Sequence, residues 1–268
     1  MAITIGTDPE FWLIDKVTSL PASAHVWEDR LGTKEHPLPC VSGATQVDGM
    51  AMEFNTNPVS TEEDFVSNIN TVLAHIRSVV SDKFDFSFAP VVVFPEEVFA
   101  MTPDENKLLG CSPDFNAWYG GKANDVPLPP DATPTMRTAS GHIHVGVDDP
   151  DNLDRIALVK ELDAVLYPMS TLWDKDKSRS EVYGSPGSFR TKPYGLEYRV
   201  LSNVWLSSPD LVRYVYRVTN QVVENFNNGV RIVTEKNFHP SLLTDESIGR
   251  WINNVLVAEY KFEVPNVK

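Results

Sequence analysis

The sequence contains few of the features that stabilise secreted or membrane proteins. Its 268 residues include only two cysteines, Cys40 and Cys111, too few for a disulfide framework or a cysteine-based zinc site. We therefore expect a reduced, cytoplasmic protein. No apolar run approaches the roughly 20 residues that span a bilayer. The first residues, MAITIGTDPEFWLI, have no basic segment before an apolar one and so do not resemble a signal peptide.

Positive charge is also scarce in this chain. It has 23 Lys and Arg residues against 37 Asp and Glu residues, which gives a net charge of −14. Nucleic acid is therefore not expected as the main ligand, because non-specific binding depends on basic groups that neutralise phosphates. An acidic protein still binds an anionic ligand where metal ions or a local group of arginines reverse the charge.

Helix-like and strand-like segments follow one another without strict alternation. The helical patterns cover approximately 60–83, 150–173, 208–229 and 244–258, and most begin at recognisable capping residues. The strand-like segments are 2–14, 47–55, 86–94, 140–147 and 195–202. The order predicts an α+β fold, with a mainly antiparallel sheet and helices packed on one side of it.

Four of the strand-like segments share one layout, in which two polar side chains at positions i and i+2 are backed by apolar residues. The pairs are Asp8 with Glu10, Glu53 with Asn55, His142 with His144, and Glu197 with Arg199. Side chains at i and i+2 of a strand lie on one face. A solvated face would explain any one pair, but carboxylates, imidazoles and a guanidinium group in all four segments favour a site for metals and phosphates.

If these four faces line one hollow, several carboxylates come close together, and divalent cations would relieve their repulsion. Carboxylates with an occasional imidazole suit Mg²⁺ or Mn²⁺, so we expect two or three such ions. Arg137, Arg190 and Arg199 lie near these strands, and guanidinium groups match phosphate geometry. The combination predicts a nucleoside triphosphate ligand, although the sequence has neither a Walker-type loop nor a GxGxxG motif.

Four motifs in this order resemble those of a known family. They are GTDPEFWLI (6–14), VDGMAMEFN (47–55), SGHIHVG (140–146) and FRTKPYGLEYR (189–199). Singly they are similar to strands of glutamine synthetase and glutamate–cysteine ligases, and as a set to the phage-type carboxylate–amine (COOH.NH2) ligases of type 2. The resemblance covers about residues 1–206.

The resemblance implies a glutamine-synthetase-like catalytic domain over residues 1–268. Such a domain has a curved, mainly antiparallel sheet, helices on the convex side and a funnel-shaped active site on the concave face. The segment 115–136, which is rich in proline and glycine, would be a lid or an insertion loop.

The resemblance also implies an ATP-dependent amidoligase, which joins a small-molecule or peptide carboxylate to an amine through an acyl phosphate. ATP and Mg²⁺ or Mn²⁺ would be its cofactors. Glu10 and Glu53 would share one ion, and Asp8, His142 and Glu197 would hold a second. His144 would contact substrate or phosphate, and Arg190 and Arg199 would grip the transferred phosphoryl group.

Three further residues are candidates without a firm equivalent in the family. Arg137 is a candidate for phosphate binding, and Asn55 and Asp114 are candidates for substrate binding. Asp114 follows a turn-like Ser-Pro, where an aspartate more often caps the turn.

Two other functions would use the same residues. A metal-dependent hydrolase would need the histidines and carboxylates but not the arginines. A non-enzymatic phage protein that retains the fold would have no physical need to cluster carboxylates. A thermal shift with ATP and Mg²⁺ would favour the ligase. The sequence predicts no membrane partner, a location in the host cytoplasm if a phage encodes the protein, and no particular oligomeric state.

Overall fold

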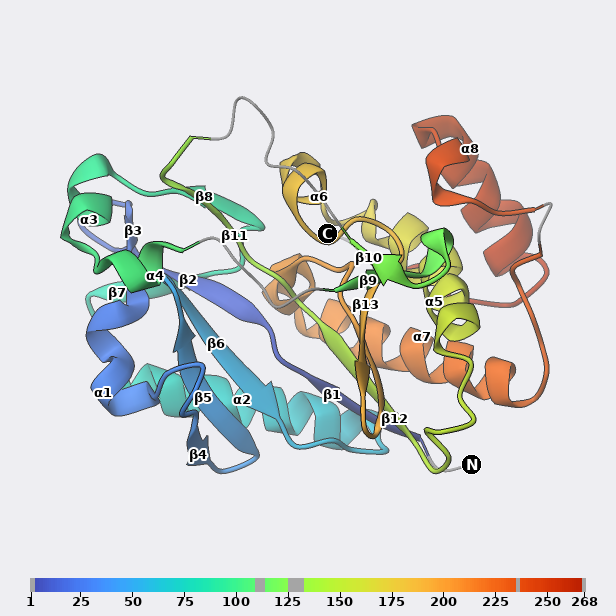
Figure 1. Cartoon of the computed structure of the whole chain (residues 1–268), viewed down its shortest axis with the longest axis horizontal. Helices are drawn as coiled ribbons and strands as arrows, with labels where there is room; N and C mark the ends of the chain where they lie inside the picture. Colours follow the sequence, from blue (N-terminus) through green and yellow to red (C-terminus); the bar gives the residue numbers. More distant parts are fainter. Residues whose placement is uncertain (1–2, 109–113, 125–132, 235–236, 267–268) are drawn as a thin grey trace.

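Two antiparallel sheets lie next to each other and carry the polar motifs (Figure 1). The computed structural model describes residues 3–108, 114–124, 133–234 and 237–266. The first sheet has the strand order β1 (Ile3–Thr7), β12 (Ile143–Val147), β14 (Gly195–Tyr198), β13 (Ser188–Lys192), β9 (Phe115–Asn116) and β10 (Lys122–Ala123). Three of the predicted motif strands therefore lie side by side in β1, β12 and β14.

The second sheet contains the remaining motif strand. Its order is β3 (Pro21–Ala22), β2 (Glu10–Asp15), β6 (Ala51–Thr56), β5 (Gly43–Asp48) and β4 (Leu38–Cys40), and β7 (Phe84–Ser87) also pairs with β2. A separate two-stranded sheet is formed by β8 (Val91–Val93) and β11 (Met136–Thr138). All of these strand pairs are antiparallel, so the predicted class of α+β with antiparallel sheets is confirmed.

A two-residue step at Asp8 and Pro9 joins the two sheets. The chain leaves the first sheet at the end of β1 and enters the second at the start of β2, where Phe54 N donates a hydrogen bond of 3.3 Å to Pro9 O. The prediction of one strand over 2–14 was therefore wrong. The predicted strand 86–94 is likewise divided, because Pro90 lies between β7 and β8 and a proline cannot continue a ladder of hydrogen bonds.

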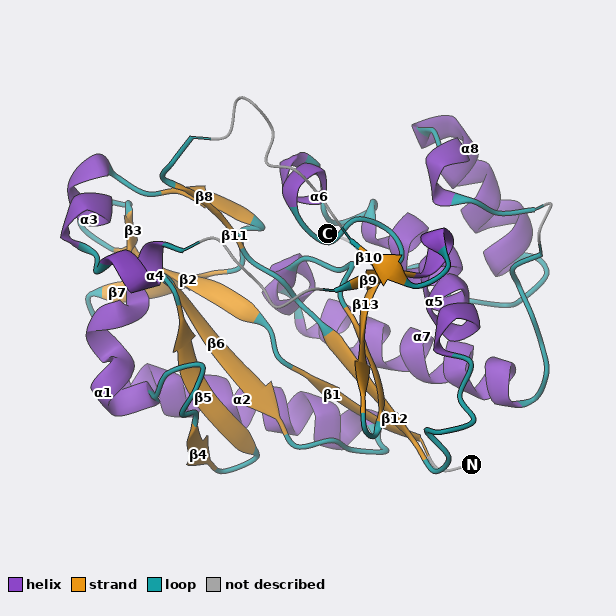
Figure 2. Cartoon of the chain, in the orientation of Figure 1, coloured by secondary structure: helices purple, strands orange, loops and turns teal. Residues whose placement is uncertain are grey.

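Three long helices cover the apolar faces of the two sheets (Figure 2). α2 (Glu62–Val79) packs against β5 and β6, α5 (Arg155–Ser170) against β13 and β14, and α7 (Pro209–Asn227) against β1. The apolar residues that alternate with the motif residues, such as Ile5, Phe54 and Ile143, are fully buried in one core with these helices. The polar residues of the motifs consequently face away from the helices.

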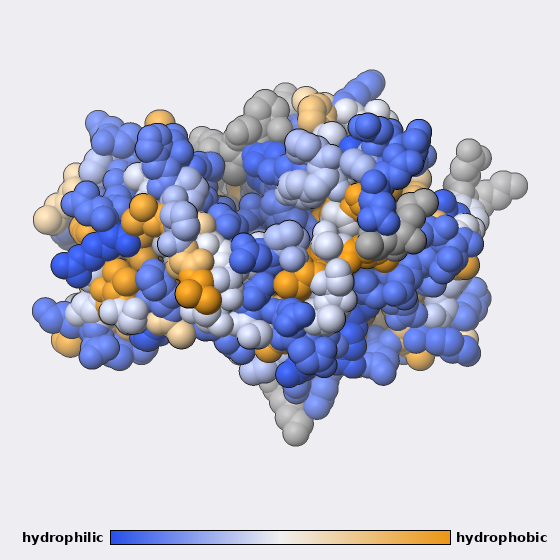
Figure 3. All heavy atoms as spheres, turned by 90° about the horizontal axis from the view of Figure 1, so that it is seen from below, coloured by the Kyte–Doolittle hydropathy of each residue, from blue (hydrophilic) through white to orange (hydrophobic). Residues whose placement is uncertain are grey.

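The remaining helices are short. They are α1 (Glu28–Leu31), α3 (Glu96–Met101), α4 (Asp104–Lys107), α6 (Ser178–Val182) and α8 (Asp245–Arg250), which continues as a π-helix over Trp251–Val257. Among the described residues, no helix combines the length and the hydropathy that crossing a bilayer requires. The face shown in Figure 3 is mainly hydrophilic, with its apolar side chains in small, separate patches.

Part of the predicted lid forms the edge of the first sheet. β9 and β10 are joined by a 3₁₀ helix at Ala117–Tyr119, and β9 pairs with β13. Residues 125–132 of the predicted lid lie outside the described part of the chain. A lid over 115–136 therefore stays a prediction.

A buried carboxyl group ties this edge to the core. Asp163 of α5 accepts hydrogen bonds from Trp118 Nε1 at 2.6 Å and from the Tyr198 hydroxyl at 2.7 Å. Burial raises the pKa of Asp163 to about 7, although these hydrogen bonds oppose the shift. Because an unfolded aspartate titrates near pH 4, the folded state retains a proton that the unfolded state loses between about pH 4 and pH 7.

We expect Asp163 to make the free energy of unfolding fall as the pH rises through this window. Relative to Asp163→Asn, which does not titrate, the wild-type protein should lose about 3 kcal/mol between pH 5 and pH 8. Urea unfolding of both proteins at the two pH values measures this difference. If the free energies of unfolding of the two proteins differed by the same amount at pH 5 and at pH 8, the prediction would be contradicted.

Candidate functional site

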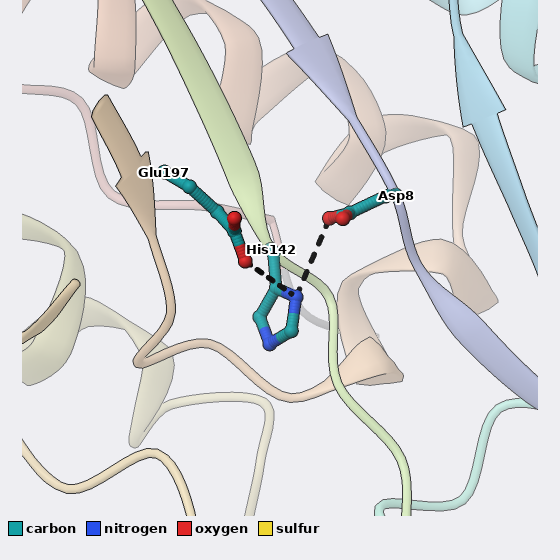
Figure 4. A group of neighbouring side chains, drawn as sticks. All are labelled: Asp8, His142 and Glu197. Carbon is teal, nitrogen blue, oxygen red and sulfur yellow. Dashed lines mark ion pairs between the residues drawn. The ribbon is translucent and has the colours of Figure 1, made fainter. Parts of the chain in front are cut away.

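Two clusters of potential metal ligands lie on the polar faces of the sheets. The His142 group consists of Asp8, His142 and Glu197, and the Glu53 group consists of Glu10, Asp48 and Glu53. Within each group, one ligand atom from every residue lies within 4.8 Å of the others. Figure 4 shows the carboxylates of Asp8 and Glu197 pointing towards His142 from the two sides of the segment that carries it. Each group is therefore compact enough for its members to share one cation.

Strand register brings the His142 group together. β12 pairs with β1 so that Ile143 lies opposite Thr7, and with β14 so that His144 lies opposite Glu197. The Thr7 hydroxyl donates a hydrogen bond of 2.6 Å to the backbone oxygen of His142. A Cβ atom at Gly141 would lie 2.3 Å from Trp205 Nε1, so the backbone before His142 can approach this tryptophan only with a glycine.

Asp8 lies between the two imidazoles. Its Oδ1 atom is 3.3 Å from His142 Nδ1 and 2.9 Å from His144 Nε2. Burial opposes ionisation of Asp8, but the two histidines outweigh it and hold the pKa well below its usual value. Burial and the nearby Arg199 lower the pKa of His142 to about 3. His142 is therefore neutral near pH 7, which is the state that binds metals.

Three basic side chains converge on the buried Glu197 carboxylate. Lys192 Nζ lies 2.7 Å from Oε2, Arg190 Nη1 lies 3.8 Å from Oε1, and Arg199 Nη1 donates to Oε1. Arg199 Nε also lies 3.5 Å from Asp114 Oδ2, so the predicted substrate residue Asp114 is part of this network. The basic groups exceed what one carboxylate neutralises, which is suited to a bound anion.

Negative charge is in excess in the Glu53 group, whereas basic side chains are in excess around Glu197. Glu10 lies opposite Glu53 in the β2–β6 pair, and Lys34 forms an ion pair with Asp48. Gln46 Nε2 donates to Glu53 at 2.7 Å, and Ser140 N donates to Glu10 at 2.7 Å. Burial, together with the neighbouring carboxylates, raises the pKa of Glu10 to about 7 and that of Glu53 well above its usual value. Burial is the larger cause of both shifts, and the neighbouring carboxylates add to it.

A cavity of about 390 Å³ adjoins both groups. Its wall includes Asp8, Glu53, His144 and the predicted substrate residue Asn55. The other lining residues are Thr4, Gly6, Thr7, Gln46, Thr56, Pro58, Gly146 and Tyr194. Among the described residues, this wall has amides, hydroxyls and carboxylates but neither lysine nor arginine. The basic side chains thus surround Glu197 and do not line the cavity.

The structure places the sequence candidates in different settings. Asp8, Glu10, Glu53, His142 and Glu197 fall into the two groups in the partition that the family resemblance implies, and His144, Arg190 and Arg199 adjoin the His142 group. Arg137 differs. Its described hydrogen bonds go to the backbone oxygens of Pro134, Met136 and Lys107, which is typical of a structural arginine.

Two further site residues were missed in the sequence motifs. Asp48 lies in VDGMAMEFN, where the Asp-Gly pair marks a hairpin turn that brings position 48 beside the strand of Glu53. Lys192 lies two residues after Arg190 and so shares its face of β13. Both signals were present in the sequence.

Comparison with known proteins gives a match to one family model and a weak likeness to a solved structure. Residues 133–240 match the family described as phage phiEco32-like COOH.NH2 ligase-type 2, which confirms the predicted family resemblance. Two of the four motifs, at 6–14 and 47–55, lie outside the matched range. Among solved structures, the bifunctional glutathione synthetase from Pasteurella multocida has a TM-score of 0.45 and 10% sequence identity. That match covers 98% of this chain but 46% of the other, so the chain spans about half its length. No curated protein matches the chain.

Proposed function

Because the chain matches the type 2 COOH.NH2 ligases over residues 133–240, we propose that it is an ATP-dependent carboxylate–amine ligase. In the first step a carboxylate oxygen takes the terminal phosphoryl group of ATP, giving an acyl phosphate and ADP. The amine nitrogen then bonds to the acyl carbon, the bond to phosphate breaks, and the nitrogen loses a proton. The observation that carries this proposal is the pair of acidic groups beside three convergent basic side chains.

The donor atoms of both groups fit Mg²⁺ or Mn²⁺. The Glu53 group offers only carboxylates and the His142 group offers two carboxylates and an imidazole, which are ligands that these ions accept. The raised pKa values of Glu10 and Glu53 support the fit, since crowded carboxylates need a counter-charge. Bound cations would neutralise phosphate oxygens at this place.

The chain's own basic groups account for the rest of the phosphate charge. Arg190, Lys192 and Arg199 surround Glu197, where their donors are held ready for the equatorial oxygens of a transferring phosphoryl group. Holding these donors in place before the reaction lowers the cost of reorganisation in the transition state. Arg137, whose guanidinium binds backbone oxygens, is not assigned to this set.

The cavity beside both groups suits an uncharged part of a ligand. Its described lining residues include no lysine or arginine, so a phosphate or carboxylate is better placed at Arg190, Lys192 and Arg199. Amides and hydroxyls, including the Asn55 amide, offer hydrogen bonds for a neutral ligand portion such as a nucleoside. Asp114, beside Arg199, remains a proposed contact for the amine or carboxylate substrate.

We also propose that the two sheets form the curved surface of one glutamine-synthetase-like catalytic domain over residues 1–268. The support is a shared core: buried apolar residues from Ile3 to Phe262 belong to one cluster beneath both sheets. In this proposal, the segment 115–136 is the lid of a funnel-shaped site.

The proposed function is tested by product release. The protein is incubated with ATP, Mg²⁺ and pools of carboxylic acids and amines, and ADP and phosphate are measured. The ligase requires release that depends on both an acid and an amine. Metal-dependent hydrolysis of added esters or amides without ATP would instead establish the metallohydrolase, and the absence of any ATP-dependent thermal shift or turnover would overturn the ligase.

We expect the two groups to differ in how they bind Mn²⁺. The Glu53 group has three carboxylates and one neighbouring ammonium group, so it should bind Mn²⁺ without nucleotide. The His142 group already contacts three basic side chains, so it should bind its ion tightly only when an anionic nucleotide is present. Electron paramagnetic resonance counts free Mn²⁺ in both conditions. Glu53→Gln should weaken the nucleotide-independent site by at least about 10-fold. Two sites of equal affinity without nucleotide would contradict the expectation.

A further inference from the structure

The two histidines of the His-x-His motif have matching surroundings. Each imidazole directs one nitrogen towards Asp8 Oδ1 and the other towards a tyrosine hydroxyl. His142 Nε2 lies 3.3 Å from the Tyr183 hydroxyl, and His144 Nδ1 is hydrogen-bonded to the Tyr194 hydroxyl. The proposed reaction assigns no step to either tyrosine hydroxyl. Because His142 is a proposed metal ligand, its tyrosine has a specific consequence for the site.

Two guanidinium groups contact the Tyr183 ring. The Cζ atoms of Arg179 and Arg199 each lie 5.3 Å from the ring centroid. Arg179 is itself buried, and it donates to Val200 O at 2.8 Å and to the Ser140 hydroxyl at 3.0 Å. Cation–π contacts on the ring therefore fix the place at which Tyr183 presents its hydroxyl to His142.

The surroundings of His142 Nδ1 indicate which group donates in the hydrogen bond between His142 Nε2 and the Tyr183 hydroxyl. Nδ1 faces Asp8 Oδ1 at 3.3 Å and Glu197 Oε1 at 3.5 Å, so it is the nitrogen that shares the centre of the group with the carboxylates. A neutral imidazole that offers the lone pair of Nδ1 to a cation carries its hydrogen on Nε2. That hydrogen then has the Tyr183 oxygen as its acceptor.

We propose that Tyr183 is a positioning residue, which orients His142 so that Nδ1 points at the centre of the His142 group. The assignment depends on the proposed function only in that the group holds a divalent cation. A histidine that ligates a metal usually donates its second N–H to an outer partner, which fixes the orientation of the ring, and loss of such a partner typically weakens binding by about 10–100-fold.

Tyr183→Phe tests the assignment, because it keeps the ring and its contacts with the two arginines and removes only the hydroxyl. Mn²⁺ binding is measured by electron paramagnetic resonance in the presence of saturating imido analogue of ATP. Glu197→Gln identifies which Mn²⁺ site belongs to the His142 group. We expect Tyr183→Phe to weaken that site by about 10-fold or more, with no loss of Mn²⁺ affinity at the Glu53 group and an unchanged melting temperature.

Tyr260→Phe is the matched control. It removes a tyrosine hydroxyl that donates to Arg231 O at 3.0 Å and belongs to neither ligand group nor to the cavity wall, so it should leave Mn²⁺ affinity within about 2-fold of wild type. Equal affinity in wild type and Tyr183→Phe overturns the assignment and leaves the ligase proposal intact. Equal weakening by both tyrosine substitutions also overturns it. Wild-type protein that binds no Mn²⁺ at all overturns the metal site itself, and the assignment with it.

Discussion

Glu197→Gln should reduce amide formation by at least about 10²–10³-fold while the protein remains folded. Glu197 is fully buried at the point where His142, Lys192 and two arginines meet. The substitution keeps the size of the side chain but removes the charge that Lys192, Arg190 and Arg199 contact and that would bind a cation in the proposed ligase. Release of ADP and phosphate with saturating acid, amine, ATP and Mg²⁺ measures the loss.

The matched control is Glu63→Gln, which removes one negative charge from the exposed first turn of α2. Its turnover should equal that of the wild type, because water and salt screen an exposed surface charge. Circular dichroism and melting curves of both variants separate loss of activity from loss of fold. A folded Glu197→Gln protein with undiminished turnover would remove Glu197 from the mechanism.

The sequence was sufficient to predict which side chains of a motif strand face the core and which face away from it. Strand periodicity assigned His142 and His144 to one face and Ile143, Val145 and Val147 to the other. Ile143 and Val145 are fully buried, and Val147, at the end of the strand, is half-buried. The face of a strand is a local property, set by alternation along the backbone. The helix begun at Ser208 and Pro209 was predicted for the same reason, since its capping residues are adjacent in sequence.

Which strands meet was not predictable from alternation alone. Asp8 and Glu10 are two residues apart and were expected on one face, yet they fall into different groups. The cause is the step at Pro9, which ends β1 and moves the chain into the second sheet. Pro lacks the backbone N–H that a continuous ladder needs, so the break has a local signal, but its direction depends on tertiary packing.

Arg137 and Asp48 show that side-chain type alone does not identify site residues. Arg137 was a candidate but belongs to neither ligand group, and Asp48 was not a candidate but belongs to the Glu53 group. Arg137 lies near the motif in sequence, but it belongs to β11 in a separate two-stranded sheet and donates to backbone oxygens. Asp48 lies within a motif, but only the register of the β5–β6 hairpin places it with Glu53. Side-chain chemistry identifies candidates, whereas register decides which of them share a site.

Arg199→Met should lower the free energy of unfolding by about 3–5 kcal/mol. Arg199 is 1% exposed, and its guanidinium contacts both Glu197 and Asp114. Its removal leaves two acidic groups buried with one fewer counter-charge, and burial already raises the pKa of each of them. Urea unfolding at pH 7 measures the change. The nearby Lys192 and Arg190 still neutralise part of the charge on Glu197, which favours the lower end of this range.

The double variant Glu197→Gln/Arg199→Met separates the cost of an unpaired charge from the cost of lost packing. With the carboxylate neutralised, no charge on Glu197 remains to be compensated, so the double variant should be more stable than the sum of the single changes predicts, by about 1–3 kcal/mol. Arg250→Met, at an arginine whose side chain is 66% exposed, should change stability by less than about 0.5 kcal/mol. Strict additivity of the two single changes would show that Arg199 stabilises the fold through its packing, and that the charges gathered at Glu197 are instead neutralised by Lys192 and Arg190.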